Sequence, residues 1–110
     1  MAKSALPLLQ GSLDLLVLAA LSSGATHGYG VATLVRARSA SAFEIEDAAL
    51  YQALHRLERR GLVAAEWGLS DNNRRARFYE LTAEGRSRLR ADTANWRRYA
   101  QAVSAVLKGV

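Results

Sequence analysis

The sequence predicts a mainly α-helical fold with one small β-hairpin and a long C-terminal helix. Three observations support this prediction. Apolar residues recur at helical spacing in the N-terminal half, two alternating runs at 62–67 and 76–81 flank a turn-rich segment, and a heptad-spaced apolar pattern runs through 83–108. The chain has 110 residues, which is enough for one compact domain.

The first two helices are separated by a glycine-rich segment. Residues 12–22 form an amphipathic pattern with Ser12 as the expected N-cap. The segment 23–30 contains three glycines and ends this helix, and a second helix is expected over about 30–38. The alternation at 42–46 predicts a short strand.

A third helix is expected at about 48–60, with Asp47 as its N-cap and Gly61 ending it. Leucines at 50, 54 and 57 fall on one face, which predicts a core face. The opposite face and its borders carry residues suited to a DNA groove: Ala49, Tyr51, Gln52, His55, Arg56 and Arg59. Gln pairs bidentately with adenine and Arg with guanine, and a small alanine lets the backbone approach. An ordinary solvated helix face is the alternative interpretation.

The tip of the hairpin concentrates positive charge. The run SDNNRRARFYELT at 70–82 places three arginines after a turn-forming stretch. Clustered like charges repel one another unless an anion relieves them, and each phosphate that is neutralised releases counterions. We therefore expect a cationic wing at about 68–77, with contacts from Asn73, Arg74, Arg75 and Arg77.

The charge balance of the chain also favours an anionic partner. Net charge is +5, and the segment from Arg56 to Arg98 holds eleven arginines against six acidic residues. Such a balance favours a polyanionic partner such as nucleic acid; a merely arginine-rich soluble protein is the alternative. Three helices followed by a hairpin is the order of a winged helix-turn-helix domain.

The C-terminal helix is longer than a small domain needs. About 26 residues span about 39 Å, and Leu89, Trp96 and Val103 repeat every seven positions. A second row holds Tyr99 and Val106, and Leu107 widens the stripe. This pattern predicts a homodimer through the helix; a tail folded back over the first helix is the alternative. We expect a domain at 1–82 and a dimerisation helix at 83–110.

Several function classes find no support in the sequence. Cysteine is absent, which excludes disulfides and thiolate metal sites. The two histidines, His27 and His55, complete no catalytic triad or HExxH spacing, so neither an enzyme nor a bound cofactor or metal is expected. The apolar stretch at 13–21 is too short to span a bilayer. A cytoplasmic protein is expected.

The chain resembles the PadR family of bacterial transcriptional regulators over nearly its whole length. The resemblance is carried by LLQGSLDLLVLAAL (8–21), HGYGVATLV (27–35), ALYQALHRLERRGLV (49–63), NNRRARFYELTAEG (72–85) and the NW pair at 95–96. It implies a nucleoid-associated homodimer, usually a repressor, that binds a palindromic operator. The third helix would enter the major groove, and the wing would touch the backbone or minor groove. The dimer would be built from the C-terminal helix and Leu13 and Leu16 of the first helix, with Trp96 near its centre.

The run AALYQAL departs from the family pattern. Ala48, Ala49 and Gln52 stand where the family usually shows glycine, a hydroxyl residue and proline. We therefore expect an altered operator preference. Some family members hold flat apolar ligands between aromatic residues of the dimer helices, so Trp96 and Tyr99 are candidates for a small aromatic effector; the alternative is that both rings simply fill the dimer core. A winged-helix scaffold for proteins and an RNA-binding module are the rival functions.

Overall fold

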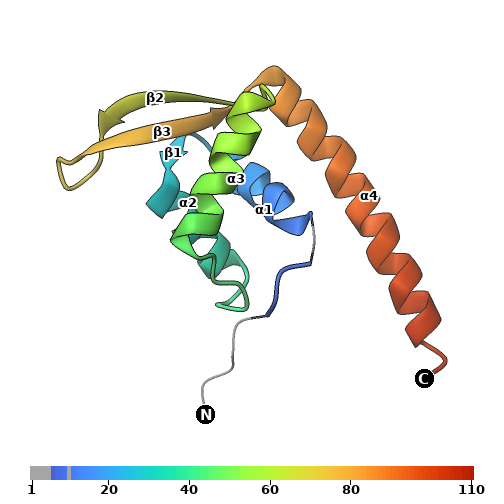
Figure 1. The fold of residues 1–110 in the computed structure, drawn as a ribbon. Helices are drawn as coiled ribbons and strands as arrows, with labels where there is room; N and C mark the ends of the chain where they lie inside the picture. Colours follow the sequence, from blue (N-terminus) through green and yellow to red (C-terminus); the bar gives the residue numbers. More distant parts are fainter. Residues whose placement is uncertain (1–5, 10) are drawn as a thin grey trace, which may run out of the picture.

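The computed structural model describes residues 6–9 and 11–110, and it contains four helices and three strands within them. In chain order these are α1 (Ser12–Leu21), β1 (Thr26–His27), α2 (Gly28–Arg38), α3 (Asp47–Arg59), β2 (Val63–Leu69), β3 (Arg75–Leu81) and α4 (Ala83–Leu107). Helices α1 to α3 pack together, the β2–β3 hairpin projects to one side, and α4 runs away on the other (Figure 1). The predicted mainly α fold with a small hairpin and a long last helix is confirmed.

The core lies between the first three helices and the base of the hairpin. The largest fully buried side chains include Leu18, Leu21, Leu54, Leu57 and Tyr79. The predicted core face of α3 is confirmed, because its leucines and Ala53 are all buried. The opposite face of α3 is thereby left toward solvent.

The sheet is antiparallel, with β3 in the centre and strand order β1-β3-β2. In the hairpin, Val63 pairs with Leu81 and Leu69 with Arg75. The two-residue strand β1 was not predicted. It is held only because His27 and Thr26 lie opposite Phe78 and Tyr79 of β3, a long-range pairing that local alternation does not reveal.

Three local predictions are wrong. Residues 42–46 form no strand, and Phe43 and Ile45 instead anchor a loop on the core. Neither Ser12 nor Asp47 is an N-cap, since each is the first residue of its helix and the capping positions are Gly11 and Glu46. The Ser12 hydroxyl donates backward to the Leu9 carbonyl at 2.6 Å instead.

Helix α4 starts at a tightly bonded junction. Thr82 caps it, because its hydroxyl accepts a hydrogen bond from the Gly85 N–H at 3.0 Å. The same hydroxyl donates to the Gly61 carbonyl at 2.7 Å, and the Thr82 N–H donates to the Leu62 carbonyl at 3.2 Å. Leu89 still packs on the core, but the helix then leaves the domain (Figure 1). Among the described helices, none has the length and apolar character needed to cross a membrane.

Candidate nucleic-acid interface

The exposed face of α3 carries the polar residues that the helical spacing placed there. Tyr51, Gln52, His55 and Arg59 are exposed, and Ala49 is half-buried near the start of the helix. The first turn bears Asp47 and the last turn bears Arg59. Donors, acceptors and a cation are therefore distributed along one accessible side of a short helix, as base reading in a groove requires.

Arg56 has an intramolecular partner that the sequence did not predict. Its Nε and Nη2 donate to the two carboxylate oxygens of Asp14 on α1, at 3.2 and 2.5 Å. This bidentate contact with Asp14 raises the pKa of the Arg56 guanidinium above its ordinary value. Arg56 is half-buried, so it is held toward α1 and differs from its exposed neighbours on α3.

The tip of the wing is a short turn that presents two arginines, neither of which forms an ion pair within the described residues. Ser70 and Arg74 close it through a backbone hydrogen bond at 2.8 Å, and Asn73 takes the left-handed conformation with φ at 63°. Arg74 and Arg75 are exposed. The Arg75 guanidinium carbon lies 4.6 Å from the ring centroid of Trp67, a cation–π contact that lays the side chain along the hairpin.

Arg77 ties the wing to α3. Its Nη2 donates to the Glu58 carboxylate at 2.8 Å, and the residue is half-buried. Next to it, burial raises the pKa of the Tyr79 hydroxyl above its ordinary value, so this ring stays neutral in the core. Two of the four predicted wing residues, Arg74 and Arg75, thus stand free of ion pairs within the described chain, while Arg77 fixes the angle of the hairpin.

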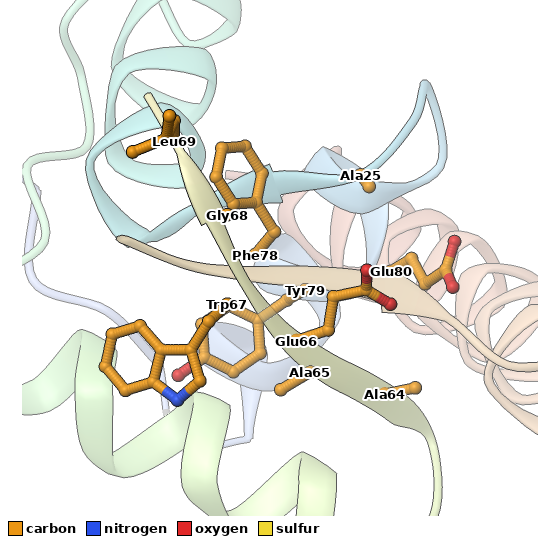
Figure 2. A pocket seen from close by; sticks show the side chains of 10 residues that line it. All are labelled: Ala25, Ala64, Ala65, Glu66, Trp67, Gly68, Leu69, Phe78, Tyr79 and Glu80. Atoms are coloured by element: carbon orange, nitrogen blue, oxygen red, sulfur yellow. The ribbon is translucent and has the colours of Figure 1, made fainter. Parts of the chain in front are cut away.

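The two faces of the hairpin differ in charge. Alternation along the strands puts Trp67, Arg75 and Arg77 on the face that continues from the core toward α3. The opposite face carries Glu66 and Glu80, both exposed. Figure 2 shows the Trp67 and Tyr79 rings on one side of the hairpin and Phe78 on the other. A polyanion is therefore favoured on the strand face toward α3 and disfavoured on the opposite strand face.

The acidic face also bears a shallow cavity of about 390 Å³, drawn in Figure 2. Its lining includes Ala64 and Gly68, and the Phe78 ring covers Gly68 so closely that a Cβ there would lie 3.0 Å from the ring. Glu66 and Glu80 border the cavity. Their carboxylates disfavour phosphate, which agrees with contact on the other face.

An open groove of about 780 Å³ joins the wing to the helices on the cationic side. Its lining includes Arg74, Arg75, Arg77, Tyr51 and the start of α2. The Tyr51 ring lies over the start of α2, where a Cβ at residue 28 would meet its hydroxyl at 2.9 Å, so a larger residue there would displace the ring.

Sequence reasoning missed two aromatic residues of this groove. Tyr29 is 66% exposed and Trp67 is 58% exposed, and both line the groove beside the arginines. Their signals were present but weak. Tyr29 lies in the HGYG run. Trp67 pairs with Arg77 on one strand face, and this pairing can be recognised only when the hairpin register is known.

The predicted dimer residues fall into two sets. Leu13, Leu16 and Leu89 are half-buried against the core of their own chain. The remaining five are exposed along α4: Trp96, Tyr99, Val103, Val106 and Leu107. Large apolar side chains exposed in a continuous stripe mark an interaction surface.

The candidate effector residues border a groove between α1 and α4. The groove measures about 660 Å³ and is lined by Leu15, Asn95, Trp96 and Tyr99, among others. The two aromatic rings stack at 5.9 Å between centroids. Flat apolar molecules match such a wall in shape.

Neither histidine lies in a cluster of metal-ligating side chains in the described chain. The Nδ1 atom of His27 accepts a hydrogen bond from the Gly30 N–H at 3.1 Å, so His27 caps α2. Within residues 6–9 and 11–110, no three His, Cys, Asp or Glu side chains come together as a metal site.

Three packed helices and a hairpin that projects beside the third define the winged helix-turn-helix class. Residues 17–91 match the Transcriptional regulator PadR-like family. The chain belongs to this family, whose members are transcriptional regulators and not enzymes.

Solved structures of the family are similar over most of the chain. A PadR family regulator from Eggerthella lenta DSM 2243 is 31% identical, with 89% of this chain and 83% of that chain covered and a TM-score of 0.73. One from Clostridium difficile R20291 is 27% identical, with 88% and 99% covered and a TM-score of 0.76. Bacillus subtilis PadR in complex with operator DNA shares the fold at 19% identity, with 73% and 45% covered and a TM-score of 0.65.

Proposed function

We propose that the protein is a sequence-specific DNA-binding regulator, acting as a repressor, that binds a palindromic operator as a homodimer. The observation that carries this proposal is that Tyr51, on the exposed face of α3, and the arginines of the wing line one open groove. Glu66 and Glu80 lie on the other face of the hairpin. Family membership, and a relative solved with operator DNA, support the same reading.

In this proposal α3 enters the major groove. Gln52 and His55 supply base contacts from the exposed face, while Ala49 and Tyr51 border the approach to the backbone. Arg59, exposed in the last turn, contacts phosphate.

The wing supplies the contacts that do not depend on sequence. Arg74, Arg75 and Asn73 are exposed at the tip and reach phosphate or the minor groove. Trp67 holds the Arg75 side chain in place, and Arg77 with Glu58 sets the angle at which the wing meets DNA. Affinity and salt dependence therefore come mainly from the wing.

The homodimer is proposed to form through α4. Trp96, Tyr99, Val103, Val106 and Leu107 would be covered by the same helix of a second copy, with residues 83–110 as the dimerisation element. Two copies related by a twofold axis would present two α3 helices to inverted half-sites, which is why a palindromic operator is expected.

A small aromatic effector is a second proposal for the α1–α4 groove. The stacked Trp96 and Tyr99 rings favour a flat apolar ligand. Quenching of tryptophan fluorescence that saturates with a planar compound and changes operator affinity supports it. Flat titrations over a panel of such compounds contradict it and leave the rings as dimer core.

The function is tested by titrating labelled duplex DNA with the purified protein at two salt concentrations. We expect binding to random duplex that weakens steeply with salt, and tighter binding to sequences recovered by selection from genomic fragments. A protein-interaction scaffold gives no salt-dependent binding to any duplex. Preference for single-stranded RNA over duplex DNA would favour the RNA-binding alternative.

A further inference from the structure

Asp14 is the one charged residue of α1, and its carboxylate faces the DNA-reading helix. Both of its oxygens are engaged by Arg56, at 3.2 and 2.5 Å, and Oδ2 also lies 3.9 Å from Nη1 of Arg60. The side chain of Asp14 is 22% exposed and that of Arg56 is 42% exposed. One acidic group thus meets two cations, one from the C-terminal half of α3 and one from its C-cap.

The pairing fixes where the Arg56 guanidinium points. A carboxylate that accepts from both Nε and Nη2 matches the planar fork of arginine, so rotation of the side chain away from α1 breaks two charge-assisted hydrogen bonds at once. Arg56 lies one turn after Gln52 and beside His55 on the same helix. Without Asp14, its guanidinium would be a mobile cation next to the proposed base-reading residues.

Cohesion between α1 and α3 does not require this ion pair. The two helices already bury Val17, Leu18 and Leu21 against Leu50, Leu54 and Leu57 in one core. A partly buried ion pair adds little to stability where apolar packing is already complete. The placement of a carboxylate here is better explained by what it does to the charge offered by α3.

We propose that Asp14 is a specificity-determining positioning residue, which holds Arg56 against α1 and keeps it from binding DNA phosphate. This proposal rests on the DNA-binding function proposed above. Asp14 leaves Gln52 and His55 to choose the sequence and leaves phosphate contacts to the wing. Its cost is weaker binding to every duplex, and its benefit is a larger difference between operator and random DNA.

The experiment compares the wild type with Asp14→Asn, which keeps the shape of the side chain and removes its charge. Binding to a random duplex and to a selected operator is measured by fluorescence anisotropy over a series of salt concentrations. If Arg56 is released to one further phosphate, the slope of log Kd against log salt steepens by about 0.9. The ratio of the wild-type Kd to the Asp14→Asn Kd for the same duplex is then about 3.5-fold larger at about 50 mM salt than at about 200 mM salt. The ratio of operator to random affinity falls.

Two further variants separate this effect from charge in general and from folding. Glu80→Gln removes the same charge from the exposed, opposite face of the hairpin and should leave the slope at its wild-type value. As a single substitution, Arg56→Ala should change the salt slope little. Combined with Asp14→Asn, it should abolish the steepening of the slope that Asp14→Asn causes alone. If Asp14→Asn does not fold, the small effect of Arg56→Ala alone still tests the proposal.

The outcomes are distinct. An Asp14→Asn protein with the same slope as Glu80→Gln overturns the proposed role of Asp14, and so does a loss of about 0.9 in slope for Arg56→Ala alone. Either result leaves the DNA-binding function intact. A wild-type protein that binds no duplex in a salt-dependent way overturns the function itself.

Discussion

Gly85 decides how α4 is attached to the domain, and its substitution gives a sharp prediction. It is the one buried residue of α4. A Cβ at this position would lie 2.0 Å from the Leu62 carbonyl oxygen and 3.0 Å from its carbon. That oxygen also accepts a hydrogen bond from the Thr82 N–H, so the neighbour is backbone that is already held in place.

The cost of Gly85→Ala follows from this overlap. An ordinary C–H···O contact has a C···O distance of about 3.3–3.6 Å, so α4 or the start of β2 must move by roughly 1.3 Å. Overpacking of this kind costs about 1–3 kcal/mol, and a strained Thr82 hydrogen bond adds about 1 kcal/mol. Alanine recovers about 1 kcal/mol through its helix propensity. The net loss is roughly 1–3 kcal/mol, which lowers Tm by about 4–12 °C for a chain of this size.

The assay is thermal unfolding followed by circular dichroism, at one protein concentration because assembly shifts the apparent Tm. Gly109→Ala is the matched control, since a Cβ there meets nothing within 4 Å. Gly85→Ala should also weaken operator binding more than random-duplex binding, because it tilts the proposed dimerisation helix against α3. A Gly85→Ala protein with the Tm of Gly109→Ala would refute the packing argument.

Three further predictions concern the wing, α3 and the α4 cap. Arg75→Ala should weaken all DNA sites similarly and reduce the salt slope by about 0.9; a selective loss at one operator variant in the same anisotropy assay would mean that the wing also reads sequence. Gln52→Ala should change discrimination among operator variants by about 1–3 kcal/mol, and identical relative affinities across a panel of single-base variants would remove Gln52 from base reading. Thr82→Ala should lower the free energy of unfolding by about 0.5–2 kcal/mol through loss of the cap, measured by urea denaturation, whereas Thr82→Ser should retain most of it.

The sequence predicted what depends on local periodicity. The core face of α3, the Gly61 stop and the hairpin follow from patterns within a few residues, and all three are confirmed. The strand predicted at 42–46 failed because alternation there reflects two apolar anchors without a neighbouring strand in the described chain.

The partners of the arginines could not be predicted in this way. Asp14 and Arg56 are 42 residues apart, and Glu58 and Arg77 are 19 apart. Periodicity assigns a residue to a face of its own helix or strand, but it does not say which side chain of another element comes to meet it. The cation–π contact of Arg75 with Trp67 likewise depends on the hairpin register.

The most direct test of the central claim is selection from a pool of random duplexes by the purified protein, followed by sequencing of the bound fraction. We expect enrichment of two inverted half-sites whose centres lie about 34–36 Å apart, or a multiple of that distance. We also expect retention of the bound duplexes to fall steeply with added salt. A bound fraction with no enriched sequence, retained equally at low and high salt, would contradict the proposed function.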